Sequence, residues 1–355
     1  MGFKELDIII ESPKLKEIKG ANDIFPSITL ENGSDFKNIL QKFEMIFTNI
    51  SKKESLIKIL PNNDVCRFCG EKGDENRNFN NSHAIPLSLG NKQQFLCLNE
   101  CNICNSNFSK YLENDFKWVL NVIRNFHGIE GGNEKKIPIF KDKNEKITFD
   151  NKESNFTKLI ISFKEKIRTI QYNDKTDEVI FNYKVNCHSP IAAYKTLLKM
   201  FLSLIEDEKI LSNFSKIISW IQNKNHEPLL EDMPLKVIQI IHHIKNPFDK
   251  PIVYLFKSKV EDLEYFDFMF LLIIGPISFQ IGIHTDRELS EKKDKNILKI
   301  DSSFFIPGLT GIYRKSSIQI LDWNKTKNKD TFSFTIPKES IINFEEIKPY
   351  IIKKG

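Results

Sequence analysis

Apolar residues recur with the three-and-four spacing of helices in some stretches of the chain and with the alternation of strands in others. Two stretches have the helical spacing, and each predicts a helix with one buried face. Their apolar positions are Phe36, Ile39, Leu40, Phe43, Ile46 and Phe47 in the first, and Phe108, Leu112, Phe116, Val119, Leu120 and Ile123 in the second. Residues 128–155 follow the second stretch; because they contain glycines, a proline and many lysines and asparagines, they are expected to form a linker.

The chain beyond residue 155 mixes both patterns. Alternating apolar residues predict strands at 159–163 and 179–185. Ser189 followed by Pro190 has the pattern of a helix N-cap with proline in the first turn, so a helix is expected to begin there, with more helix as far as about His243. From Ile252 onward the sequence again favours strands. These are expected at residues 268–274, 279–283, 297–300 and 332–336.

The composition is that of an ordinary globular protein. The 355 residues are 40% hydrophobic and 28% charged, with 14 glycines and 14 prolines, which excludes collagenous and disordered classes and allows two or three domains. The longest apolar run, residues 268–274, is far short of the roughly 18 residues that span a bilayer. Lys4, Glu5 and Asp7 stand where a signal peptide would be apolar. We expect a cytoplasmic protein with no membrane role.

The positive charge lies mainly in the C-terminal part. The formal net charge is +5, and residues 131–355 carry 36 lysines and arginines against 30 acidic residues, while residues 1–130 are nearly neutral. If the partner is a polyanion, we expect most phosphate contacts from the C-terminal part. Alternatively, the lysine-rich and asparagine-rich usage reflects only the composition of the genome.

Four of the six cysteines form two Cys-x-x-Cys pairs, Cys66 with Cys69 and Cys101 with Cys104. Four thiolates close a tetrahedral zinc site and leave no position for water, which is typical of structural zinc. In a chain without a signal peptide, this pattern favours a metal over disulfides. The 31 residues between the pairs are more than a compact zinc ribbon needs, so a further segment is expected to be inserted between the knuckles. Cys97 lies outside both pairs and is expected to be a small buried side chain.

The order of motifs in this region resembles a known family. His83 opens a His-Ala-Ile-Pro stretch inside the insert, and Asn105 directly follows the last cysteine. Two Cys-x-x-Cys pairs with these elements in this order resemble the HNH, or ββα-metal, endonucleases, in particular the members that zinc staples together. The resemblance covers about residues 65–113.

The resemblance implies a domain organisation. It places an HNH ββα-metal zinc module at residues 61–127, after an N-terminal arm or cap at residues 1–60. A larger domain at residues 156–355 would then recognise the target or regulate the nuclease. The expected fold class is therefore α+β, with a small ββα-metal or treble-clef zinc module joined to a larger mixed α+β C-terminal domain.

The same resemblance implies metal-dependent hydrolysis of phosphodiester bonds. Two knuckles on one zinc ion would fix a hairpin to the start of a helix, so that His83 faces Asn105 across a groove. A neutral imidazole can take a proton from water, and an amide oxygen is a hard ligand for Mg²⁺ or Mn²⁺. His83 would be the general base, and Asn105 would help to hold the ion that stabilises charge on the leaving 3′-oxygen.

The remaining roles are less closely determined. Many family members carry an acidic residue or histidine just before the base, where this chain has Ser82; its hydroxyl is a candidate ligand but a poor sole partner for Asn105, so another metal ligand is needed. Glu113 lies eight residues after Asn105, slightly more than two helical turns, and is a candidate on about the same face; Asp74 or Glu75 of the hairpin are the alternatives. The family's middle asparagine, which orients the loop that carries the histidine, corresponds to Asn99, with Asn91 as second choice.

Each candidate also has a simpler interpretation. His83 can be a surface histidine or a spare zinc ligand, Asn105 can cap a helix, and Glu113 can be a solvated helix residue. The alternative to a nuclease is then a non-catalytic treble-clef zinc module that binds nucleic acid or protein. Ser82 in the place of a ligand favours that alternative.

We expect a metal-dependent endonuclease that acts on DNA, with RNA as the other substrate left open. By analogy, the resemblance implies a prokaryotic setting such as restriction or phage defence. One site cuts one strand, so cleavage of both strands would require a homodimer. A regulatory partner protein is not identified by the sequence.

Overall fold

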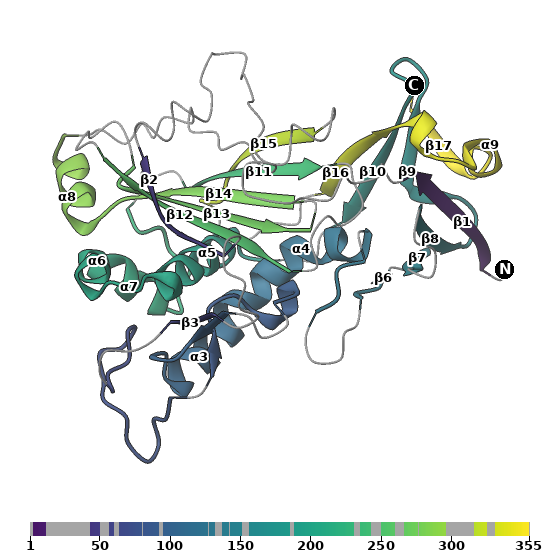
Figure 1. Ribbon diagram of the computed structural model, residues 1–355. Coiled ribbons are helices and arrows are strands. Elements are labelled where there is room, and N and C mark those ends of the chain that lie inside the picture. Colours follow the sequence, from purple (N-terminus) through teal and green to yellow (C-terminus); the bar gives the residue numbers. More distant parts are fainter. Residues whose placement is uncertain are drawn as a thin grey trace.

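The fold is a mixed α+β arrangement with a small module at one end, as expected from the sequence. The computed structural model of the chain describes residues 3–11, 43–49, 57–59, 64–79, 81–91, 95–126, 128–131, 137–141, 143–150, 156–184, 188–230, 235–242, 250–259, 266–275, 277–295, 316–324 and 331–354. Within these residues the strands form four sheets, and the helices lie mainly between the largest sheet and the small module (Figure 1).

A six-stranded antiparallel sheet forms the centre of the molecule. Its strand order is β15-β11-β14-β13-β12-β2. The strands are β2 (Phe43–Thr48), β11 (Lys236–His242), β12 (Ile252–Ser258), β13 (Phe268–Ile274), β14 (Ile277–Ile283) and β15 (Ser316–Asp322). All seven side chains of β13 are buried, so both faces of the sheet are covered at its middle. This explains the uninterrupted apolar run in the sequence.

Helices cover the face of this sheet that points toward the small module (Figure 1). They are α5 (Pro190–Leu204), α6 (Glu208–Leu211), η3 (Ser212–Phe214) and α7 (Ser215–Gln222), with α8 (Asp286–Lys295) at one end. Helix α5 begins as the sequence predicts, because the Ser189 hydroxyl accepts the backbone N–H of Ala192 at 3.2 Å. Phe201 of α5 packs against Phe268 and Phe270 with ring centroids 5.8 and 6.4 Å apart, which fixes the helix on the sheet.

Two four-stranded sheets form a second lobe. Their strand orders are β1-β8-β7-β6 and β16-β10-β9-β17. The strands are β1 (Lys4–Glu11), β6 (Phe140–Lys141), β7 (Glu145–Asp150), β8 (Phe156–Phe163), β9 (Ile167–Asn173), β10 (Glu178–Lys184), β16 (Thr331–Pro337) and β17 (Ile351–Lys354). The short helices η4 (Lys338–Ser340) and α9 (Phe344–Ile347) connect β16 to β17.

The small module combines a three-stranded sheet with a long helix. The sheet has the order β3-β5-β4. Its elements are β3 (Ile57–Ile59), β4 (Ser82–His83), η1 (Leu87–Leu89), β5 (Phe95–Cys97), α3 (Asn102–Phe108), η2 (Ser109–Glu113) and α4 (Asn114–Phe126). The last three form one helix, in which η2 is a π-helical turn. The Phe116 ring lies 5.3 Å from that of Phe279 in β14, so the module packs directly on the C-terminal part.

The helix predicted from the first apolar stripe is wrong where the structure describes it. Residues Phe43–Thr48 form strand β2 at the edge of the six-stranded sheet. Phe43 and Phe47 are its buried side chains, and positions four residues apart share a face in a strand as well as in a helix. Spacing alone therefore did not distinguish the two. Phe36, Ile39 and Leu40 lie outside the described residues.

Two further predictions are also wrong. The expected linker contains β6 and β7, and β7 pairs along its whole length with β8. The helix expected as far as His243 ends at α7, and Lys236–His242 is strand β11. The strand expected at residues 297–300 lies outside the described residues, whereas the other strand predictions are confirmed. None of the helices in the described ranges has the length and apolar character that crossing a membrane requires.

The N-terminal strands are distributed over three sheets. β1 pairs with β8 in the second lobe, β2 with β12 in the large sheet, and β3 with β5 in the small module. The first 60 residues thus contribute to every part of the described fold. The domain boundaries expected from the sequence stay predictions.

Candidate functional site

The four paired cysteines meet at one point of the small module. The sulfur atoms of Cys66, Cys69, Cys101 and Cys104 all lie within 4.8 Å of one another. The sulfurs of Cys69 and Cys101, one from each pair, are 3.9 Å apart. Four sulfurs around one zinc ion at bond lengths of about 2.3 Å would be about 3.8 Å apart. The cluster therefore fits the zinc site expected from the sequence.

Local backbone geometry prepares the sulfurs for a metal. The backbone N–H of Cys101 donates to the sulfur of Cys66 at 3.4 Å, and that of Cys104 donates to the sulfur of Cys101 at 3.5 Å. A hydrogen bond from the Cys104 thiol lowers the pKa of Cys66 well below its usual value. Gly70, with φ of 72°, closes the first knuckle in the left-handed region. The hydrogen bond to Cys66 favours its thiolate, which is the form that binds zinc, whereas burial raises the pKa of Cys69.

Cys97 is not part of this cluster. It is fully buried in β5, its sulfur donates to the Asn99 side chain at 3.5 Å, and burial raises the pKa of its thiol to about 11. A thiol held protonated in this way behaves as a small apolar side chain. The interpretation of Cys97 as a buried side chain is confirmed.

A groove on the module brings the main candidate residues together. His83, at the end of β4, and Asn105, in α3, line the same cavity of about 350 Å³, and Glu113 lines it as well. The hairpin side also contributes Pro86, Leu87 and Ser88, and the helix side contributes Ser109, Asn114 and Lys117. The four-sulfur cluster connects the two sides of the groove, because Cys101 caps the helix that carries Asn105 while the hairpin lies between the two cysteine pairs.

The imidazole of His83 is half-buried on the wall of the groove. Burial, and then the positive charge of Lys199, lower the pKa of His83 below its ordinary value, so the ring is neutral at pH 7. Its Nδ1 atom is buried and has no hydrogen-bond partner among the described residues. A neutral ring with an unpaired nitrogen fits the general base implied by the resemblance.

The π-helical turn η2 keeps the helix side of the groove on one face. Four residues make slightly more than one turn of an α-helix and slightly less than one turn of a π-helix. In an α-helix, side chains four residues apart therefore turn gradually around the axis, and the π turn rotates them back. The groove is lined by residues at intervals of four along this helix, namely Asn105, Ser109, Glu113 and Lys117. Glu113 is thus on the face of Asn105, as the sequence analysis expected.

Ser82 and Asn99 do not line this groove. Ser82 is buried beneath the hairpin, and its hydroxyl donates to the backbone carbonyl of Glu100 at 3.3 Å. The side-chain oxygen of Asn99 accepts a hydrogen bond from Nε of Arg67 at 2.6 Å, and this bond fixes the first cysteine knuckle. Both side chains serve the framework of the module in this structure rather than the groove.

Asn91, the second choice for the middle asparagine, makes the contacts expected of that residue. Its side-chain amide donates to the carbonyl of Ile85, two residues after His83, and its oxygen accepts the backbone N–H of Phe95 at 3.1 Å. Gly90, with φ of 84°, ends η1 just before it. Asn91 thus holds the loop that carries the histidine against β5.

Sequence reasoning missed Lys199 of α5. Its ammonium group is fully buried beneath the groove and is 2.8 Å from the backbone carbonyl of His83, 3.2 Å from Glu100 and 3.3 Å from Glu113. Burial raises the pKa of Glu100 to about 7, and the charge of Lys199 opposes that rise. The available signal was a lysine inside an otherwise apolar helical stretch, but lysines at helix surfaces are too common for this signal to stand out.

Further contacts fix the module to the C-terminal part. Arg67 of the first knuckle donates to the carbonyls of Leu202 and Ile205 at the end of α5, at 2.5 and 3.2 Å. Gln222 of α7 donates to the carbonyl of Phe68 at 2.7 Å. The geometry of the groove therefore depends on α5 and α7 as well as on the module.

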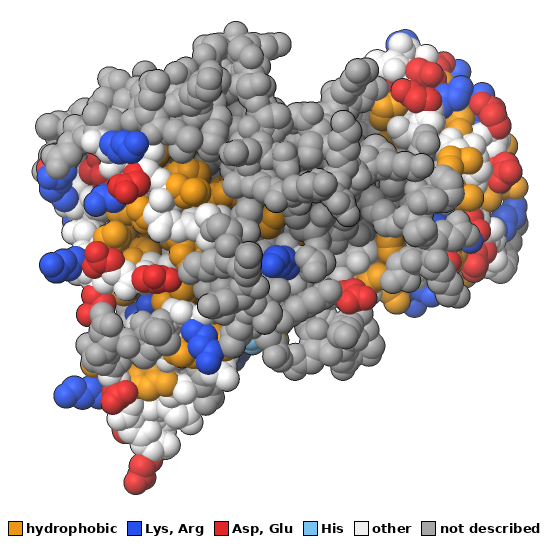
Figure 2. All heavy atoms as spheres, viewed as in Figure 1, with side chains coloured by type: hydrophobic (Ala, Val, Ile, Leu, Met, Phe, Trp, Pro, Cys, Tyr) orange, Lys and Arg blue, Asp and Glu red, His pale blue; other side chains and the backbone are white. Residues whose placement is uncertain are grey.

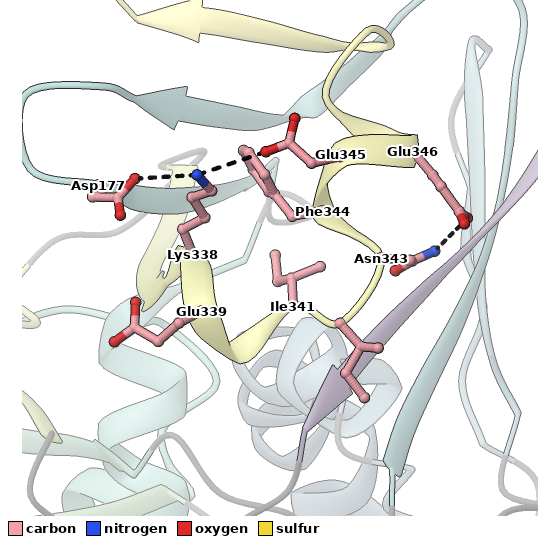
Figure 3. A pocket seen from close by; sticks show the side chains of 9 residues that line it. Asp177, Lys338, Glu339, Ile341, Asn343, Phe344, Glu345 and Glu346 are labelled. Carbon is pink, nitrogen blue, oxygen red and sulfur yellow. Dashed lines mark hydrogen bonds and ion pairs between the residues drawn. The ribbon is translucent and has the colours of Figure 1, made fainter.

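A second cavity, of about 390 Å³, lies in the other lobe, far along the chain from the groove (Figure 3). The Lys338 ammonium in its wall is 3.9 Å from Asp177 and 3.6 Å from Glu345, and it stacks on the Phe344 ring at 5.1 Å. Asn343 donates to Glu346 at 3.4 Å. Because these polar groups bind one another, the cavity offers no converging donors for a ligand.

Asp267, His284 and Glu288 form another group whose donor atoms lie close together. Hydrogen bonds within the group and with Thr285 explain this proximity. His284 Nδ1 is 2.6 Å from Glu288, and Asp267 accepts both the backbone N–H and the hydroxyl of Thr285, at 2.7 and 2.6 Å. Asp267 thus anchors the start of α8.

The described charges do not gather into one basic patch on the face drawn in Figure 2, where blue and red side chains alternate over the described surface. The expected phosphate contact of the C-terminal part stays a prediction.

Comparison with known proteins identifies the module. The family model for HNH endonuclease matches residues 66–120, from the first cysteine to the middle of α4. Neither the curated proteins nor the solved structures contain a match. The resemblance inferred from the motifs is confirmed for this segment.

The zinc site can be tested by Cys101→Ser. Zinc should fall from about one ion per chain to nearly none, and the melting temperature should fall with it, because three thiolates leave the coordination open. Metal analysis after dialysis and thermal unfolding measure both. Cys97→Ser is the control, because Cys97 is buried but lies outside the cluster, and this variant should keep its zinc. If Cys97→Ser loses zinc while Cys101→Ser keeps it, the assignment is contradicted.

Proposed function

We propose that the chain is a metal-dependent endonuclease that hydrolyses phosphodiester bonds, with DNA as substrate. The proposal rests on the HNH endonuclease segment, whose groove is lined by a neutral histidine and by side chains with hard oxygen atoms. The observation that carries the proposal is that His83 and Asn105 line one groove beside the four-sulfur cluster. A binding module would not need a neutral, partly buried imidazole there.

His83 is the proposed general base. Its ring is neutral at pH 7, and because Nδ1 is buried, Nε2 is the ring nitrogen that would accept a proton from a water molecule in the groove. Asn91 holds the loop of His83, and Lys199 holds its carbonyl, so the ring is kept in place while the proton moves. Fixed orientation of this kind makes a general base effective.

Asn105 and Glu113 are the proposed ligands of a divalent cation. Amide and carboxylate oxygens suit Mg²⁺ or Mn²⁺, and both residues line the groove together with His83. The ion supplies a positive charge that stabilises the leaving 3′-oxygen. Ser82 was the other candidate; because its hydroxyl is bonded to Glu100, we assign it no role at the metal.

The family description implies a nucleic-acid substrate but does not distinguish DNA from RNA. We propose DNA, and RNA is tested beside it. A chain with one such groove nicks one strand, so cleavage of both strands would need a homodimer. A prokaryotic setting in restriction or phage defence, with a regulatory partner protein, is proposed on analogy with the family alone.

A non-catalytic zinc module that binds nucleic acid or protein is the second candidate. The buried, hydrogen-bonded Ser82 favours it, because the groove lacks a ligand just before the histidine. Crystals soaked in Mn²⁺ would distinguish the two. Anomalous scattering beside Asn105 and Glu113 supports the nuclease, whereas an empty groove at saturating Mn²⁺ supports the binder.

His83→Ala should lower the rate of plasmid nicking in Mg²⁺ or Mn²⁺ by about a hundredfold or more, because the water loses its base. Zinc content should not change. His226→Ala is the matched control, since His226 is also half-buried with an unpaired Nδ1 but does not line the groove. Equal nicking by wild type and His83→Ala would remove His83 from the mechanism.

Asn105→Ala should raise the Mn²⁺ concentration needed for half-maximal nicking by about tenfold or more, because the ion loses a ligand. Asn102→Ala is the control: Asn102 lies in the same helix, but its side chain bonds to the backbone of Asn76 and Asn78. The measurement is a metal titration of the nicking rate. An unchanged titration in Asn105→Ala would contradict the assignment.

The nicking rate should rise with pH in the acid range. Only the neutral imidazole accepts a proton, and the pKa of His83 is lowered from its ordinary 6.5, so the rising limb of log kcat against pH should have its midpoint below that value. At saturating Mn²⁺ the rate should reach a plateau by neutral pH. A limb centred well above 6.5 would assign the base to another group.

A further inference from the structure

A lysine from outside the HNH segment lies directly beneath the groove. Lys199 belongs to α5, between the module and the six-stranded sheet (Figure 1), and its side chain is fully buried. The matched HNH segment ends at residue 120, so this charge enters the module from the C-terminal part of the chain.

The ammonium group contacts three separate elements of the module. It donates to the backbone carbonyl of His83 in β4 at 2.8 Å, and it is 3.2 Å from the carboxylate of Glu100 and 3.3 Å from that of Glu113 in η2. The His83 carbonyl accepts a hydrogen bond from the ammonium, and the two carboxylates pair with it as ions; neither oxygen of the Glu100 carboxylate has a hydrogen-bond partner among the described residues. The three contacts fix the distance between the strand of the proposed base and the helix of the proposed metal ligands.

The buried charges of Lys199 and its partners require close pairing. A buried ammonium is unfavourable unless it is paired, and the two carboxylates supply that pairing. Glu100 is itself fully buried and precedes Cys101, so it connects Lys199 to the cysteine cluster. A small shift of Lys199 would therefore move the histidine strand, the cluster and Glu113 relative to one another.

We propose that Lys199 is a positioning residue of the nuclease site, through which the C-terminal part of the chain sets the geometry of the groove. The inference rests on the function proposed above. It assigns Lys199 no contact with substrate: it acts through the His83 backbone and the Glu113 carboxylate.

Lys195 provides a matched control on the same helix. It lies one turn before Lys199 and is equally buried, but its ammonium donates to the carbonyls of Asn223 and Asn225 at 3.0 and 3.2 Å and lies over the Trp220 ring. None of these groups lines the groove. Lys195→Met thus measures the effect of removing a buried ammonium from α5 without touching the site.

The experiment compares three variants of the full chain: Lys199→Met, Lys195→Met, and a double variant that carries both Lys199→Met and Glu100→Gln. The double variant removes the carboxylate that Lys199→Met would leave buried and unpaired, so it should regain most of the melting temperature lost in the single variant. Its kcat for nicking should nevertheless stay about a hundredfold below wild type, because the histidine strand has lost its anchor. KM for the duplex should change by less than about threefold, since no substrate contact is removed. Lys195→Met should keep the wild-type kcat.

Three results would overturn the inference. A double variant that nicks as fast as wild type would make Lys199 a counter-ion of Glu100 and nothing more. A Lys195→Met chain that loses as much kcat as Lys199→Met would assign the effect to α5 in general. A wild-type chain that nicks neither DNA nor RNA in Mg²⁺ or Mn²⁺ would remove the proposed function and the inference together, whereas the first two results leave the function standing.

Discussion

The meeting of four sulfurs at one point is the constraint on which the candidate site depends. The two cysteine pairs are separated by 31 residues, and closing them on one ion would fix the hairpin of His83 to the first turn of the helix of Asn105. A metal that binds only the folded form would add stability to the packing of the module. Its sheet has only three short strands, so the sulfur cluster would help to hold the hairpin of His83 opposite the helix of Asn105.

The cysteine cluster alone does not complete the groove. Arg67, Gln222 and Lys199 connect the module to α5 and α7, and all three bond to backbone carbonyls. Bonds to backbone fix the position of a segment rather than one rotamer, so these contacts set where the knuckle and the hairpin lie. The C-terminal part is therefore in direct contact with the site. A change in how α5 and α7 pack on the six-stranded sheet would change the position of the groove's walls.

The sequence predicted the cysteine cluster and part of the fold. His83, Asn105 and Glu113 were candidates because ligands and bases need particular atoms at particular spacings, and the structure brings all three to one groove, where their roles stay predictions. β2 was taken for a helix because a spacing of four residues fits both structures, and β11 was missed because its apolar residues continue a helical region. Asn91 was only the second choice for the middle asparagine, and Lys199 was missed because its contacts join segments distant along the chain. The π turn at η2 leaves no mark in the sequence that we recognise.

The balance of charge beneath the groove bears on the cation proposed to bind there. Lys199 is the one ammonium shared by two carboxylates, Glu100 and Glu113, so if both are ionised a negative charge is left over. Glu100 is fully buried, whereas the side chain of Glu113 is 14% exposed and borders the groove. The excess charge is therefore better accommodated on Glu113, where a cation in the groove can compensate it at short range. Ser82 stands where the resemblance implies an acidic or histidine ligand, and Glu113 would instead present a negative oxygen to the proposed metal, from the helix rather than from the hairpin.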